Sequence, residues 1–174
     1  RFLERSYAAL EAAVERALPG APRLPMDVTV EESVAAVAEE LERREVRLAG
    51  VLHAIAMDKT IRGGAVKPLL DVTREEFMGA MDVSAYSLVA LCRHLVGRAR
   101  LISGGSVVAL SYRGAGFVMD HPYRNMGVAK AALERIVLER ADELGRRSGL
   151  RVNGVRFSPY DGSRAGGAAP GRDG

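Results

Sequence analysis

The sequence has few of the features that mark secreted or membrane proteins. It contains one cysteine, Cys92, within an apolar run, and no tryptophan. A single cysteine excludes a disulfide framework and fits a reducing compartment. No apolar run approaches the roughly 18 residues that a membrane-spanning helix needs. We therefore expect a cytoplasmic protein with a buried Cys92 and no membrane partner.

An excess of one charge is lacking as well. Lys and Arg number 25 against 22 Asp and Glu, a formal net charge of +3, and the two signs are interleaved along the chain. Without a cationic block, nucleic-acid binding is not expected. The three histidines, His53, His94 and His121, do not have the spacing of metal ligands, so no metal site is expected.

What remains is a globular composition, 48% hydrophobic and 27% charged, of a length that suits one domain. Apolar residues at spacings of three and four predict helices over 2–18, from 29 onward, over 73–97 and over 123–147. Short apolar runs predict strands at 23–28, 48–57, 106–112 and 152–157. The run at 48–57 is nearly continuous, which is typical of a strand buried on both faces.

Two of these helices are expected to begin with a capping box. Thr29 is followed three residues later by Glu32, and Thr73 by Glu76. In such a pair the hydroxyl and the carboxylate satisfy free amides at the helix start reciprocally. Alternating strands and helices then predict an α/β domain with a mostly parallel sheet.

The expected domain covers residues 1–161, and 162–174 form a glycine-rich tail that is flexible or discontinuous. Four strands are few for a doubly wound sheet, and the first segment is a helix with no strand before it. We therefore expect that the sequence represents an incomplete domain.

The chemistry centres on Tyr123 and Lys130. Seven residues apart at the start of a predicted helix, they lie on one face, about 10.5 Å apart along the axis. A lysine ammonium can fold back beneath the phenol, favour phenolate character and donate to a ribose hydroxyl. The same spacing also fits an interfacial tyrosine and a solvated lysine. The preceding buried strand ends in Tyr112, and ligands of open α/β sheets bind beyond strand carboxyl ends, which favours the catalytic interpretation.

The surrounding sequence resembles the short-chain dehydrogenase/reductase superfamily and, within it, the enoyl-[acyl-carrier-protein] reductases. The matching stretches are Ser-Tyr-Arg-Gly-Ala (111–115) and Tyr-Arg-Asn-Met-Gly-Val-Ala-Lys (123–130). Three more follow the family order: His-Ala-Ile-Ala (53–56), Val-Ser-Ala-Tyr-Ser (83–87) and Arg-Val-Asn (151–153). The resemblance implies a Rossmann-like doubly wound parallel sheet in three α/β/α layers.

The resemblance also implies a function, the NAD(P)H-dependent reduction of a trans-2-enoyl thioester. Tyr123 would bond to the thioester carbonyl and stabilise the enolate, with hydride delivered to the β-carbon. Lys130 would hold the nicotinamide ribose, and Tyr112 would position or protonate the substrate. Asp58 falls where the family contacts substrate, although its residue type differs.

For the cofactor, NADH or NADPH, the resemblance implies that Asp27 and Val28 lie along the adenine and Ile55 against the dinucleotide. Tyr160 stands in the segment that would hold the nicotinamide amide. The substrate would be an acyl-carrier-protein or CoA thioester. The helices at 73–97 and 123–147 match those that pair between subunits, so a homodimer or homotetramer is expected.

Two departures leave other functions open. The glycine-rich turn that binds pyrophosphate has no counterpart in the sequence. The family's Gly-Pro-Ile-x-Thr appears as Ser-Pro-Tyr-Asp-Gly at 158–162. The alternatives are a short-chain ketoreductase of secondary metabolism and a cofactor-free, non-redox descendant of the fold.

Overall fold

The structure is a computed structural model that describes residues 11–62, 65–98, 100–119 and 123–157. Its main feature is a parallel sheet of β1 (Leu48–His53), β4 (Leu101–Tyr112) and β5 (Arg151–Phe157), in the order β1-β4-β5. Strand β4 pairs with β1 and with β5, both in parallel. Three strands therefore end at one edge of the sheet.

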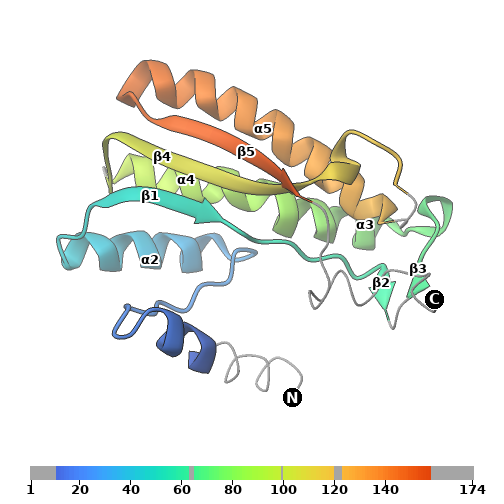
Figure 1. Cartoon of the computed structure of the whole chain (residues 1–174), viewed down its shortest axis with the longest axis horizontal. Coiled ribbons are helices and arrows are strands. Elements are labelled where there is room, and N and C mark those ends of the chain that lie inside the picture. The colour runs from blue at the N-terminus through green and yellow to red at the C-terminus, as the bar shows by residue number, and fades with distance from the viewer. Residues whose placement is uncertain (1–10, 63–64, 99, 120–122, 158–174) are drawn as a thin grey trace.

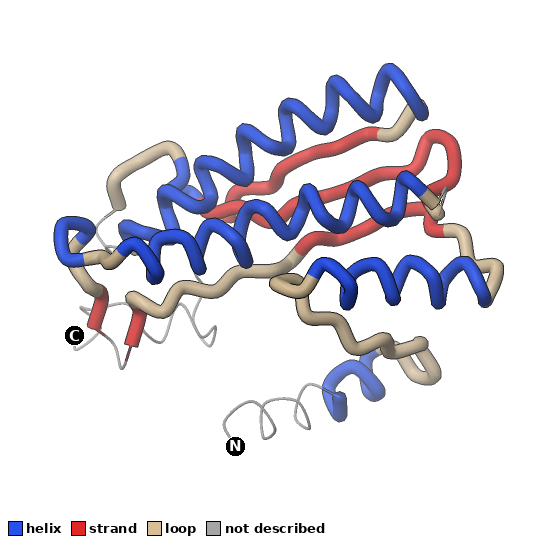
Figure 2. The backbone as a smooth tube through the Cα atoms, turned by 180° about the vertical axis from the view of Figure 1, so that it is seen from behind, coloured by secondary structure: helices blue, strands red, loops and turns tan. Residues whose placement is uncertain are grey.

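The helices lie on one face of this sheet, behind it in Figure 1 and in front of it in Figure 2. They are α2 (Glu31–Arg43), α3 (Arg74–Met81), α4 (Ser87–Gly97) and α5 (Arg124–Ser148). The hydrophobic core lies between them and the sheet, around Leu88, Leu133 and Val107. Cys92 is buried in this core, as predicted.

The opposite face of the sheet is exposed among the described residues. Leu52, Val155 and Phe157 alternate with inward-facing neighbours and are 63%, 48% and 46% exposed. The prediction that β1 is buried on both faces is therefore wrong for this part of the chain, because helices cover only one side. Residues 54–57 follow β1 outside the sheet.

The predicted helix at 73–97 is confirmed, with an interruption. The capping box forms as expected, since Thr73 accepts from the Glu76 amide and the Glu76 carboxylate accepts from the Thr73 amide. Between α3 and α4 the chain forms a π-helical segment, η2 (Asp82–Tyr86). Single π turns widen a helix locally and often occur at functional sites.

Two expectations near α2 are wrong. Residues 23–28 form no strand, and α2 begins at Glu31 after Val30, which makes no side-chain cap. The Thr29 hydroxyl is instead bonded to Asp27, whose Oδ1 accepts from the Thr29 amide (2.9 Å) and hydroxyl (2.7 Å). This local turn competes with the capping box that the sequence predicted.

Residues 11–17 are helical, in agreement with the described part of the helix predicted at 2–18, and residues 1–10 lie outside the described residues. Smaller elements lie elsewhere in the chain. A ribbon of β2 (Ile61–Arg62) and β3 (Ala65–Val66) is followed by the 3₁₀ turn η1 (Leu69–Asp71), and η3 (Arg113–Ala115) follows β4. The helix predicted at 123–147 is α5, and the strands predicted at 106–112 and 152–157 are β4, which starts earlier, and β5. No helix in the described ranges is long and apolar enough to cross a bilayer. The domain extent of 1–161 stays a prediction, and the tail at 162–174 lies outside the described residues.

Candidate active site

Two tyrosines meet at the carboxyl edge of the sheet. Tyr112 ends β4 and Tyr123 directly precedes α5; both are buried, and their ring centroids lie 6.3 Å apart at 54°. Burial raises the pKa of both phenols above the usual value. Burial thus favours the protonated phenol of Tyr123, which can donate a hydrogen bond, and phenolate character induced by Lys130 stays a prediction.

Two glycines permit this arrangement. A Cβ on Gly114 would overlap the Tyr112 ring, and a Cβ on Gly127 would lie 2.8 Å from the carbonyl oxygen of Gly114. The loop after β4 therefore packs directly on the first turn of α5. The absence of side chains at these two positions brings Tyr112 and Tyr123 together.

Lys130 is buried beneath the same edge. It is 4% exposed, and its Nζ donates to the carbonyl oxygens of Ile55 (3.0 Å) and Leu110 (2.9 Å). Burial lowers the pKa of Lys130 to about 8. An ammonium has three donors, so within the described part of the chain these two bonds leave one for a ligand. Ile55 and Lys130, which sequence reasoning assigned to the cofactor, are thus in direct contact.

The tyrosines separate two cavities. The inner one, about 180 Å³, is lined by Ile55, Met126 and Lys130 together with both tyrosines. The outer one, about 490 Å³, lies between the loop after β4 and α5, and includes Phe117 and Val118. Both are mainly apolar, and Tyr112 and Tyr123 face both.

Behind the inner cavity, His53 is completely buried at the end of β1. The Ser87 hydroxyl donates to the Val83 carbonyl (2.7 Å), so it accepts from His53 Nε2 (2.8 Å). Burial first, and then the positive charge of Lys130, lower the pKa of His53 to about 4. His53 is therefore a neutral histidine in the protein interior.

The π-helical segment supplies a second buried serine. The Ser84 hydroxyl accepts from the Met57 amide (3.1 Å) and donates to the Met57 carbonyl (3.2 Å). Ser84 and Ser87 thereby fix the chain on both sides of Ile55. Both serines belong to the Val-Ser-Ala-Tyr-Ser stretch (83–87), for which the sequence alone predicted no role.

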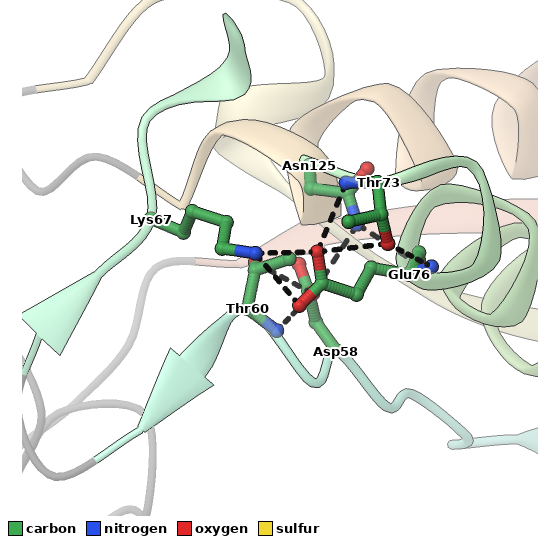
Figure 3. Close-up of polar contacts among 6 residues, drawn as sticks. All are labelled: Asp58, Thr60, Lys67, Thr73, Glu76 and Asn125. Carbon is green, nitrogen blue, oxygen red and sulfur yellow. Dashed lines mark hydrogen bonds and ion pairs between the residues drawn. The ribbon is translucent and has the colours of Figure 1, made fainter. Parts of the chain in front are cut away.

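Asp58 belongs to a polar network (Figure 3). Its Oδ1 accepts from the Thr60 amide (2.9 Å), from the Thr60 hydroxyl (2.7 Å) and from Nδ2 of Asn125 (3.2 Å). Nearby, Lys67 Nζ pairs with the Glu76 carboxylate at 2.7 Å. Substrate contact by Asp58 stays a prediction. Asn125, the second residue of α5, was missed because its position in the motif does not reveal burial.

The remaining predicted residues lie apart from this centre. Asp27 and Val28 precede α2, which begins at the end of the molecule to which the strands point (Figure 1). The Asp27 carboxylate is bonded to Thr29, which lowers its pKa. Their adenine contact stays a prediction. Tyr160 and His121 lie outside the described residues.

On the other side of β4, the Glu134 carboxylate accepts from the Ser111 hydroxyl (2.6 Å) and from Arg156 Nε (2.7 Å). Arg156 lowers the pKa of Glu134. These contacts join β4, α5 and β5 directly below Tyr112.

A parallel sheet whose central strand ends in a tyrosine, followed by a helix with Tyr123 at its start and a buried Lys130, defines a domain of the short-chain dehydrogenase/reductase superfamily. Comparison with known proteins identifies the family. The model of the enoyl-(acyl carrier protein) reductase family matches residues 3–172, and the chain belongs to this family. The predicted family is confirmed.

Among curated relatives, the chain is 42% identical over 136 residues to enoyl-[acyl-carrier-protein] reductase [NADH] 1 of Rhizobium meliloti (strain 1021), covering 76% of this chain and 47% of the relative. It is 35% identical over 159 residues to enoyl-[acyl-carrier-protein] reductase [NADPH] FabI of Staphylococcus aureus. That match covers 90% of this chain and 59% of the relative. The chain thus spans about half the length of the curated relatives it matches.

Solved structures confirm the Rossmann-like fold. The FabI–NADH complex from Alistipes finegoldii matches with a TM-score of 0.76 and 28% identity, over 84% of this chain and 50% of that one. The enoyl-[acyl-carrier-protein] reductase (NADH) from Aquifex aeolicus matches with a TM-score of 0.70 and 36% identity, over 80% of this chain and 53% of that one.

Proposed function

We propose that the protein reduces trans-2-enoyl thioesters with NADH or NADPH. The observation that carries the proposal is the placement of Tyr123 and Lys130 on one cavity at the strand ends, in a chain of this family. The substrate is an acyl-carrier-protein or CoA thioester.

The inner cavity fits a nicotinamide ribose. Its walls are apolar at Ile55 and Met126, and Lys130 retains one donor beyond its two backbone bonds. Lys130 would direct that donor to a ribose hydroxyl, and Ile55 would pack against the dinucleotide. When bound there, NADH or NADPH would supply the hydride that the β-carbon of the substrate receives.

Tyr123 acts on the thioester. Its pKa is raised by burial, so the phenol is protonated and donates to the carbonyl oxygen, where negative charge grows as the enolate forms. A donor fixed at that oxygen stabilises the transition state more than the ground state. Tyr112, which lines both cavities, positions the acyl group or delivers the proton that completes reduction at the α-carbon.

The test is an assay of the full-length protein with crotonyl thioesters of CoA and of acyl-carrier protein. The expected result is that either thioester causes oxidation of NADH or NADPH, measured as a fall in absorbance at 340 nm. Turnover of a β-ketoacyl but not an enoyl thioester would select the ketoreductase alternative. Calorimetry that detects no binding of either dinucleotide would select the cofactor-free alternative.

The proposal includes a homodimer or homotetramer in the cytoplasm, formed through α4 and α5. Leu138, on α5, is an apolar side chain that is 61% exposed. Light scattering of the full-length protein measures its mass in solution, and a monomeric mass would contradict this part of the proposal.

A further inference from the structure

The start of α5 lacks the side-chain cap that commonly fixes a helix N-terminus. Tyr123 is the N-cap residue, makes no capping hydrogen bond through its side chain, and has backbone angles of φ −72° and ψ 63°. The first turn carries no acidic residue that would interact with the helix dipole. Contacts that other residues of this turn make with distant segments therefore bear on the position of Tyr123.

Asn125 makes such contacts. Its side chain is almost completely buried, at 1% exposure, and its Nδ2 donates to Asp58 Oδ1 (3.2 Å) and to the Glu76 carbonyl oxygen (3.5 Å). Asp58 belongs to the segment after β1, and Glu76 belongs to α3. One amide therefore joins the first turn of α5 to two separate segments (Figure 3).

Both acceptors are themselves held in place. Asp58 Oδ1 also accepts two hydrogen bonds from Thr60, a residue that is 4% exposed. Glu76 caps α3 through Thr73 and pairs with Lys67. Asp58 Oδ2 is buried without a hydrogen-bond partner among the described residues, so the bond to Asn125 goes through the oxygen that Thr60 orients.

We propose that Asn125 is a positioning residue, which sets Tyr123 for its hydrogen bond to the substrate carbonyl. The proposal rests on the proposed reductase function. Asn125 lies two residues after Tyr123, and the same turn is closed by the bond from the Gly127 amide to the Tyr123 carbonyl (2.8 Å). A shift of Asn125 therefore moves Tyr123 with it, and displacement of a catalytic group by about 1 Å can cost 100-fold in rate.

The test is Asn125→Ala in the full-length protein. We expect kcat with a crotonyl thioester to fall on the order of 10- to 100-fold with KM unchanged, because only the transition-state interaction is lost. Val137→Ala is the matched control: it truncates another buried side chain of α5, three turns further on, and should leave kcat unchanged. Asn125→Asp keeps the side-chain volume while removing the donor, and should reproduce the loss.

A double-mutant cycle separates positioning from general destabilisation. In a Tyr123→Phe background, Asn125→Ala should cause no further loss of kcat, because it acts through the hydroxyl that is already gone. An equal loss in both backgrounds, or an unchanged kcat in the single variant, would overturn the proposal.

Hydrogen exchange gives a readout that does not depend on activity. The amides of residues 127–130 should exchange faster in Asn125→Ala than in the wild type and in Val137→Ala, because the first turn has lost its anchor. If the wild type lacks reductase activity, the proposed function fails while this measurement still tests the anchor. Unchanged exchange at these amides would show that Asn125 does not hold the turn.

Discussion

Lys130 Nζ donates to the carbonyl oxygen of Ile55 at 3.0 Å, a contact across 75 positions of sequence. Its second bond, to Leu110, ends on β4. The residue expected to bind the cofactor therefore also holds together the walls of its cavity. Burial, without a carboxylate partner among the residues that the structure describes, accounts for its lowered pKa, since desolvation disfavours the charged form.

This pKa makes stability depend on pH. Lys130 has a pKa of about 8 in the folded protein against an ordinary value of 10.5 for a lysine side chain, so between these values the unfolded chain binds the additional proton. Its contribution to the free energy of unfolding should rise with pH from 8 to 10, by up to about 1.4 kcal/mol per unit. Urea unfolding of the wild type and of Lys130→Met measures the difference, and parallel pH profiles would contradict the assignment.

His53 should also make the free energy of unfolding increase with pH, in this case in the acidic range. Its pKa is lowered to about 4 from 6.5, so the unfolded chain takes up a proton that the folded protein does not. The free energy of unfolding should fall as pH drops from 6.5 toward 4. The comparison is with His53→Gln, which retains a donor for Ser87 but cannot titrate. The difference in stability between the two proteins should therefore change between pH 7 and pH 5.

Tyr123→Phe should lower kcat on the order of 100- to 1000-fold, because a single donor at a developing oxyanion contributes about that much. The fold should persist, since the ring and its contact with Tyr112 remain. Steady-state kinetics and circular dichroism check the two parts. If this variant kept the kcat of the wild type, another residue would have to donate the hydrogen bond to the thioester carbonyl.

Gly114→Ala should be destabilising by roughly 1–3 kcal/mol, because its Cβ overlaps the Tyr112 ring. Gly79 in α3 supplies a matched control. A Cβ there meets nothing within 4 Å, so Gly79→Ala should stabilise the protein by about 0.5–1 kcal/mol through helix propensity. Thermal unfolding distinguishes the two variants, and equal shifts in Tm would contradict the packing argument.

The sequence predicted the elements that depend on local signals. The apolar spacing of α5 and the Thr73–Glu76 capping box are properties of a few adjacent residues, and the structure has both. The Tyr123 and Lys130 pair was found because its spacing matches a helix that follows a strand. Both residues line one cavity at the carboxyl ends of the strands, which is where open α/β sheets generally bind ligands.

What the sequence could not predict depends on tertiary contacts. Thr29 fits a capping box by type, but Asp27 competes for its hydroxyl. Asn125 has no local feature that marks it as buried, because its partners are 67 and 49 positions away. The raised pKa of Tyr123 likewise follows from burial, which spacing to Lys130 does not reveal.

The two carbonyls that receive Lys130 differ in how they are held. Leu110 lies on β4, which is paired on both sides, and such strands are among the last parts of a protein to open. Ile55 lies beyond the end of β1, in chain fixed by side chains rather than by a ladder. Loss of the Ile55 contact would therefore leave the ammonium bonded to β4, and the positive charge would keep its place beside the cavity.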